Sequence, residues 1–289
     1  MGLGSVKFSG KKFKVKEELG HLRLCINHMD IVDVTELKGL DKLKNITALD
    51  LSNNKITELK GLDELTNLKQ LFLNNNQLKV IEGLESLTKL DRIFLNGNQI
   101  LELKGLDSLT NLQWLEVNNN NITELKELEL LTKLIQLDLK FNQIKEIINL
   151  ELLTNLQILL LNRNQISEIK NLEALTNLHT LFLDHNQITE IKGLDTLNKL
   201  INLNLNNNKI KEIKGLETLV NLETLYLDTN QITNLHNLES LEKLEKLHLL
   251  FLGFNPIKGE EGQFATEFMG VDNVKKLLET YKKWKQVNG

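Results

Sequence analysis

Side chains that could carry chemistry are few in this chain and lie far apart in the sequence. Among 289 residues there are six histidines and a single cysteine, Cys25. One cysteine excludes an intramolecular disulfide and a zinc site built from cysteines. His185 follows Asp184, with Asp228 further along the chain, but a metal site needs convergent ligands and supporting contacts around them. We therefore expect no catalytic residue, no metal and no cofactor, and we expect Cys25 to be packed rather than reactive.

Charge and hydropathy exclude two further classes of partner. The net charge of −4 is spread over a chain in which 26% of residues are charged, so no basic field would recruit nucleic acid. No apolar run is long enough to span a membrane, and the first twelve residues lack the apolar segment of a signal peptide. The sequence predicts a soluble, cytoplasmic, monomeric protein that binds neither nucleic acid nor membranes.

The spacing of the leucines predicts the fold. The phrase Leu-x-Leu-x-x-Asn-x-Ile-x-x-Ile/Leu-x-x-Leu-x-x-Leu-x-x-Leu starts nine times at 22-residue intervals, from Leu49 to Leu225. A fixed period of this length predicts a solenoid, in which each copy stacks only on its neighbours. The alternation at the start of each copy predicts a short strand with one buried face. The apolar residues at every third position that follow predict 3₁₀-like turns.

Two polar columns recur with the leucines, and we expect both to serve the stack. The asparagines from Asn54 to Asn255 can donate and accept hydrogen bonds at neighbouring turns. A second column consists of glycines and asparagines, which tolerate the positive φ of a change in chain direction. Its members are Gly39, Gly61, Gly83, Gly105, Asn149, Asn171, Gly193, Gly215 and Asn237. Glu127 breaks this column, and a different local conformation is expected there.

Both ends depart from the period and predict caps. Alternating residues on either side of Ser9–Lys12 predict a hairpin within residues 1–21, and about eleven repeats are expected over residues 22–257. The first repeat is expected to start at Leu22, 27 residues before Leu49.

At the other end the phrase resumes three residues late, at Leu250, and residues 258–289 are expected to form a cap. Apolar residues at helical spacing predict a helix there, whose apolar face closes the last leucine layer. They are Val274, Leu277, Leu278, Tyr281 and Trp284.

The repeated phrase resembles the 22-residue class of the leucine-rich repeat family, over residues 22–257. The resemblance implies an α/β solenoid: a horseshoe with a parallel concave sheet and 3₁₀ or irregular convex turns, capped at both ends. The pattern is most similar to the intracellular type typified by the regulatory subunit of protein phosphatase 1, which has no catalytic activity and binds its partner on the concave sheet. Secreted internalins, which place a proline where this chain has glycine or asparagine, resemble it less.

The functional prediction rests on strand positions that the repeat leaves free. Two such columns bring aromatic and charged side chains onto the concave face, and exposed aromatics on a rigid sheet are typical interface anchors. Phe72, Phe94 and Trp114 are expected to form one patch, with a second around Ile158 and a third at Phe251. The predicted partner-binding residues are Asp50, Phe72, Arg92, Phe94, Trp114, Glu116, Asp138, Leu160, Phe182 and Tyr226.

We therefore expect a non-enzymatic scaffold that binds a folded protein with complementary basic and apolar groups on its concave face. Two alternatives stay open at this point. The chain could be a structural protein that self-assembles through its convex face or C-terminal helix, or it could be the regulatory subunit of a phosphatase-like enzyme.

Overall fold

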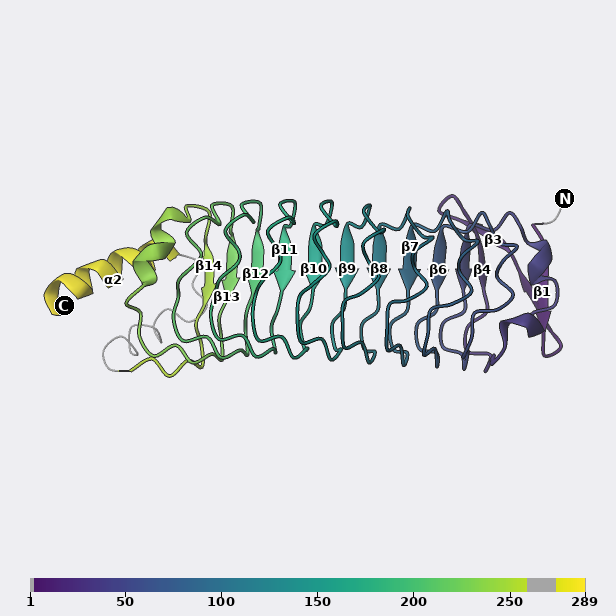
Figure 1. Ribbon diagram of the computed structural model, residues 1–289, viewed down its shortest axis with the longest axis horizontal. Coiled ribbons are helices and arrows are strands. Elements are labelled where there is room, and N and C mark those ends of the chain that lie inside the picture. Colours follow the sequence, from purple (N-terminus) through teal and green to yellow (C-terminus); the bar gives the residue numbers. More distant parts are fainter. Residues whose placement is uncertain (1–2, 259–273, 289) are drawn as a thin grey trace. The chain divides into compact units, whose positions relative to one another are not determined.

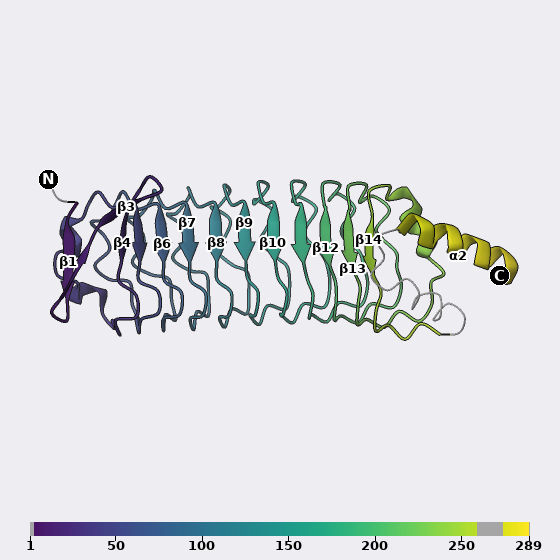
Figure 2. The same cartoon turned by 180° about the vertical axis from the view of Figure 1, so that it is seen from behind.

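The computed structural model describes residues 3–258 and 274–288, which divide into two compact units, 1–143 and 144–289. Within each unit the chain winds through successive turns, and every full turn contributes one short strand to a parallel sheet (Figures 1 and 2). Most of these strands are three residues long because only the segment around the first leucine of each phrase is extended.

Residues 1–143 form a sheet of six parallel strands in sequence order, with one antiparallel strand at its edge. The parallel strands are β4 (His21–Cys25), β5 (Ala48–Asp50), β6 (Gln70–Phe72), β7 (Arg92–Phe94), β8 (Trp114–Glu116) and β9 (Gln136–Asp138). The edge strand is β3 (Lys16–Glu18), a separate hairpin joins β1 (Ser5–Phe8) and β2 (Lys11–Lys14), and two 3₁₀ helices are η1 (Val34–Glu36) and η2 (Leu40–Lys42).

Within residues 144–258 and 274–288, the described part of the second unit, there are five further parallel strands, one 3₁₀ helix and one α-helix. The strands are β10 (Ile158–Leu160), β11 (Thr180–Phe182), β12 (Asn202–Asn204), β13 (Thr224–Tyr226) and β14 (Leu249–Phe251). The helices are η3 (Leu238–Lys243) and α2 (Val274–Asn288), and α2 is drawn in yellow in Figure 1.

The repeated leucines and isoleucines form the core of each unit. In the copy that begins at Leu71, the side chains of Leu71, Leu73 and Leu78 are fully buried. The residues after the strand close i to i+3 turns, as where Leu87 N–H donates to Leu84 O at 2.9 Å. These observations confirm the predicted α/β solenoid of leucine-rich-repeat type, with a parallel sheet and 3₁₀-like turns.

The side chains of the asparagine column form hydrogen bonds between each repeat and the one before it. Asn98 Nδ2 donates to Leu95 O in its own repeat at 2.9 Å and to Leu73 O in the preceding repeat at 3.0 Å. Its Oδ1 accepts from Leu78 N–H at 3.1 Å. The same pattern recurs at the other members of the column that the structure describes, so the prediction that these side chains serve the stack is confirmed.

The glycine and asparagine column adopts positive φ at most of its positions, and at some of them the neighbouring repeat leaves no room for a Cβ atom. Gly105 has φ of +93°, and a Cβ there would lie 1.7 Å from Ile81 O, so only glycine fits that close approach. The expectation for Glu127 is wrong, because its φ of +60° matches those of its column. The expectation for Asn237 is also wrong: its φ is −101°, and the six-residue helix η3 begins directly after it.

Two expectations about the first repeat are corrected by its register. Leu24, not Leu22, lies opposite Leu49, so this repeat precedes the next by 25 residues (49 − 24). Leu24 and Ile26 fill the core, and the alternation of a strand then turns Cys25 outward. Cys25 is therefore exposed rather than packed.

The late restart near the C-terminus is confirmed, since Leu250 lies opposite Leu225 and η3 occupies the additional chain length. The predicted helix is α2, which buries Val274, Leu277 and Tyr281. Ion pairs join α2 to η3, with Lys282 Nζ 2.8 Å from Glu242 Oε2 and Lys285 Nζ 2.9 Å from Glu239 Oε1. Residues 259–273 of the predicted cap lie outside the described residues.

Removing one amide of the asparagine column should destabilise the stack strongly. In Asn98→Ala, two buried carbonyls each lose a donor and one buried N–H loses its acceptor, so we expect the free energy of unfolding to fall by about 3 kcal/mol. Chemical denaturation measures this change. Asn45→Ala, at an exposed turn residue, is the control and should change it by less than about 0.5 kcal/mol. Similar losses in both variants would contradict a structural role for the buried amide.

Replacing Glu127 by asparagine should stabilise the protein. A left-handed conformation costs a glutamate about 1 kcal/mol, and asparagine tolerates it better. Asn171, in the same column, donates to Ile147 O at 2.7 Å, so the new amide would reach the equivalent carbonyl, that of Leu103 (127 − 24). We expect Glu127→Asn to raise the free energy of unfolding by about 1 kcal/mol, and Glu129→Asn to leave it nearly unchanged. A less stable Glu127→Asn variant would argue against strain at this position.

Candidate functional site

The free strand positions of residues 1–143 form two columns on the side of the sheet that faces away from the leucine core. The first column holds Arg23, Ala48, Gln70, Arg92, Trp114 and Gln136, and the second holds Cys25, Asp50, Phe72, Phe94, Glu116 and Asp138. Because the strands are parallel and in register, residues 22 apart become direct neighbours within a column. We call this surface the N-terminal sheet face.

Two phenylalanine rings stack at the middle of the second column. The ring centroids of Phe72 and Phe94 lie 4.6 Å apart with an interplanar angle of 4°. The guanidinium carbon of Arg23 lies 4.9 Å from the centroid of the Phe72 ring. Both phenylalanines are half-buried, which leaves part of each ring available to a partner.

The first column brings Arg92 and Trp114 into contact. The guanidinium carbon of Arg92 lies 3.8 Å from the centroid of the Trp114 ring. Trp114 Nε1 donates to Gln136 Oε1 at 2.9 Å, and Gln136 Nε2 donates to Glu116 Oε1 at 3.3 Å. Trp114, which the sequence placed with the two phenylalanines, thus stacks on a guanidinium in the neighbouring column.

Two of the predicted acids are buried and already paired. Asp50 is 7% exposed, and its Oδ2 lies 2.9 Å from Arg23 NH2. Asp138 is 3% exposed, and its Oδ2 lies 3.1 Å from Lys140 Nζ. These carboxylates hold neighbouring side chains in place and present little charge to a partner.

The predicted binding residues do not include Arg23, Asn96 and Gln136, although Arg23 pairs with Asp50, and Asn96 and Gln136 both donate to Glu116. Arg23 would have been found by aligning the first repeat on Leu24, which places Arg23 next to Ala48. Asn96 and Gln136 carry no comparable signal, because an amide at those positions looks like any other solvated residue.

The strands of residues 144–289 carry a second surface, which we describe separately. Leu160 lies opposite Phe182, and Ile158 lies opposite Thr180. The rings of Tyr226 and Phe251 stack with centroids 4.7 Å apart and an interplanar angle of 9°. We call this surface the C-terminal sheet face.

No metal site is formed within residues 3–258 and 274–288, where no three histidine, cysteine, aspartate or glutamate side chains converge. His185 Nδ1 lies 3.0 Å from Asp184 Oδ2, which is a local contact between adjacent residues. No helix in that part of the chain has the length and apolar character needed to cross a bilayer.

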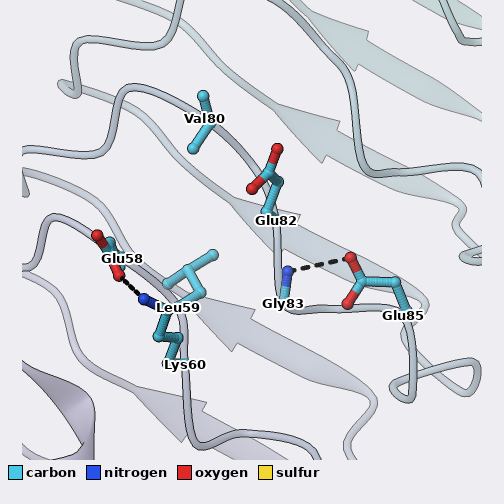
Figure 3. A pocket seen from close by; sticks show the side chains of 7 residues that line it. All are labelled: Glu58, Leu59, Lys60, Val80, Glu82, Gly83 and Glu85. Atoms are coloured by element: carbon cyan, nitrogen blue, oxygen red, sulfur yellow. Dashed lines mark hydrogen bonds and ion pairs between the residues drawn. The ribbon is translucent and has the colours of Figure 1, made fainter.

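A pocket of about 370 Å³ lies among the turns of residues 1–143, away from the sheet (Figure 3). Its polar wall groups bond to one another: Glu58 pairs with Lys60 at 2.5 Å, and Gly83 N–H donates to Glu85 Oε1 at 3.2 Å. Its other lining residues are Leu59, Val80 and Glu82.

Comparison with known proteins gives one family. The family model described as "Leucine-rich repeat" matches residues 165–288, and the model "Leucine Rich repeats (2 copies)" matches residues 66–108. A separate search of curated protein sequences finds no match.

Solved structures of this repeat type align along most of the chain. An internalin from Listeria monocytogenes is 28% identical, with 86% of this chain and 85% of that chain covered and a TM-score of 0.65. Internalin C2 from the same organism is 30% identical, with 76% and 86% covered and a TM-score of 0.55. A leucine-rich-repeat protein from Leptospira interrogans is 26% identical, with 83% and 72% covered and a TM-score of 0.59. Internalins, which the sequence pattern placed further away, are thus among the similar structures.

Asp91, which precedes Arg92 on β7, makes the stability of this region depend on pH. Burial raises the pKa of the Asp91 carboxyl, and Arg92, Lys69 and His21 oppose that shift. Oδ1 has no hydrogen-bond partner, and its ion pair with Arg92 Nε spans 3.8 Å. Where the pKa of a carboxyl is higher in the folded than in the unfolded chain, the free energy of unfolding of the protein falls as the pH rises between those two pKa values.

We therefore expect Asp91→Asn to be more stable than the parent protein at pH 7. Its advantage should shrink as the pH falls through the raised pKa of Asp91 towards the ordinary aspartate value, because the parent carboxyl is then protonated. Thermal unfolding at several pH values measures the difference. Asp107→Asn, at an exposed position outside the strands, is the control and should show no such trend. An advantage that does not change with pH would disprove the assignment to Asp91.

Proposed function

We propose that this chain, which belongs to the leucine-rich-repeat family, is a non-enzymatic scaffold that binds a protein partner through the N-terminal sheet face. Leucine-rich-repeat proteins generally act as protein-interaction scaffolds, and the fold is typically non-enzymatic. The observation that carries the proposal is the pairing of two aromatic contacts, Phe72 with Phe94 and Arg92 with Trp114, on one rigid surface.

The residue types on this face are those that dominate binding energy in protein interfaces. Tryptophan and arginine are enriched among interface hot spots, and aromatic rings provide large contact areas with few rotatable bonds. These four side chains are all half-buried, so a bound partner would remove their remaining exposed surface from water: Phe72, Arg92, Phe94 and Trp114.

The backbone beneath these side chains is rigid, which lowers the entropy lost on binding. An asparagine that bonds to two repeats follows each of the strands β5 to β9, as Asn98 does after β7. Arg23 and Arg92 are held by stacking on aromatic rings. The surface is therefore arranged before a partner arrives.

The C-terminal sheet face supports a second contact area in the same proposal. Leu160 and Phe182 are neighbours there, and Tyr226 stacks on Phe251. These half-buried apolar side chains suit the interior of an interface, whereas Asp184 and Asp228, on the same strands' C-terminal sides, suit its polar rim.

The triple variant Phe72→Ala, Phe94→Ala, Trp114→Ala tests the proposal. Because hot-spot truncations each cost about 2 kcal/mol or more, we expect capture of the partner from an extract of the source cell to fall more than tenfold. Quantitative mass spectrometry of the captured proteins measures this. The half-exposed positions lie outside the leucine core, so the variant should still unfold cooperatively.

A matched control removes apolar side chains of the same unit that lie on the turns. Val80 and Leu101 are 48% and 53% exposed, and Val80→Ala with Leu101→Ala should leave capture unchanged. If the triple variant captures the same proteins in the same amounts as the parent, the N-terminal sheet face is not the binding site.

A further inference from the structure

The second column of the N-terminal sheet face has an acid at each end of its ring stack. Asp50, Phe72, Phe94 and Glu116 are successive register neighbours. The order acid, ring, ring, acid gives the stack two ends of similar composition: at each end a ring residue has an acidic residue as its register neighbour.

One end already holds a guanidinium. Arg23 NH2 lies 2.9 Å from Asp50 Oδ2, and its guanidinium carbon lies 4.9 Å from the centroid of the Phe72 ring. The protein thereby shows how this combination of groups is satisfied: the cation pairs with the carboxylate and covers the ring.

At the other end Glu116 is held in place without a cation. Asn96 Nδ2 donates to its Oε2 at 3.0 Å, and Gln136 Nε2 donates to its Oε1 at 3.3 Å. Gln136 is itself fixed by Trp114 Nε1 at 2.9 Å. These donors are neutral amides, so they orient the carboxylate and leave its charge and several lone pairs uncompensated.

No lysine or arginine in residues 3–258 and 274–288 forms an ion pair with Glu116. Arg92 stacks on Trp114 in the other column and pairs with Asp91, while Lys140 pairs with Asp138. Of the three acids in the second column, Glu116 alone lacks a cationic partner within the described residues, and it is half-buried rather than freely solvated.

We propose that Glu116 and the adjoining ring of Phe94 receive an arginine side chain of the protein partner, as Asp50 and Phe72 receive Arg23. This inference rests on the proposed function and specifies the partner's chemistry at that surface. Arginine fits better than lysine, because a planar guanidinium can stack on a ring and donate to a carboxylate at the same time.

The probes for this inference are peptides of twelve random residues, displayed on phage and selected on the intact protein. Selected sequences that compete with one another should share an arginine, and replacing it by alanine should weaken binding about tenfold. Glu116→Gln should weaken binding of the arginine peptide by a similar factor and reduce its salt dependence. Replacing the arginine by lysine should recover only part of the affinity.

A double-mutant cycle separates a direct contact from a loss of structure. Glu116→Gln should have almost no effect on the alanine peptide, because the arginine contact is already absent from that complex. Glu102→Gln, at an exposed carboxylate on the turns of the same unit, should bind the arginine peptide like the parent. Equal weakening of both peptides by Glu116→Gln would overturn the inference.

The outcomes distinguish the inference from the proposed function. Peptides that lose binding in the Phe72→Ala, Phe94→Ala, Trp114→Ala variant but share no arginine would support the N-terminal sheet face as the binding site. They would overturn the inference that Glu116 and Phe94 receive an arginine. Peptides whose binding survives that variant, or a selection that yields no binder, would count against both. A dimer seen by sedimentation and abolished by Glu116→Gln would make a second copy of the chain the occupant and overturn the assignment to a different protein.

Discussion

The structure depends on the asparagine amide that follows each strand from β5 to β14. A solenoid turns its backbone away from the sheet ladder once per repeat, and each turn leaves main-chain groups that would be costly to bury unpaired. The amide of Asn98 supplies two donors and one acceptor to those groups, in its own repeat and in the preceding one. Because these main-chain groups are paired, leucines can fill the interior beside each turn.

The same constraint leaves the outward strand positions free. Leucines and asparagines meet the needs of packing and hydrogen bonding, so residues such as Phe72 and Glu116 are unnecessary for the stack. Their placement still follows from it, since register brings residues 22 apart into contact. The regular interior therefore fixes which outward residues become neighbours, and the types of those residues, which do not repeat, determine the chemistry of the surface.

Periodicity predicted the strands, the turn bonds and the three-residue delay before Leu250, because each depends on local pattern alone. It was wrong where a neighbour's requirement outweighed residue preference. Glu127 adopts a left-handed conformation that its side chain disfavours, because the stack needs the turn there. Asn237 does not adopt it, and the longer 3₁₀ helix η3 begins directly after it. Cys25 faces outward because Leu24 and Ile26 take the core positions on either side of it.

The sequence by itself determined the repeat, the parallel sheet and the columns in which candidate binding residues stand, because a fixed period translates directly into fixed neighbours. Only the tertiary structure decided how those residues are paired. Asp50 and Asp138 have cations and are buried, whereas Glu116 is held by amides alone. That difference depends on how far side chains from separate repeats reach across the sheet, a geometric quantity that no spacing in the sequence expresses.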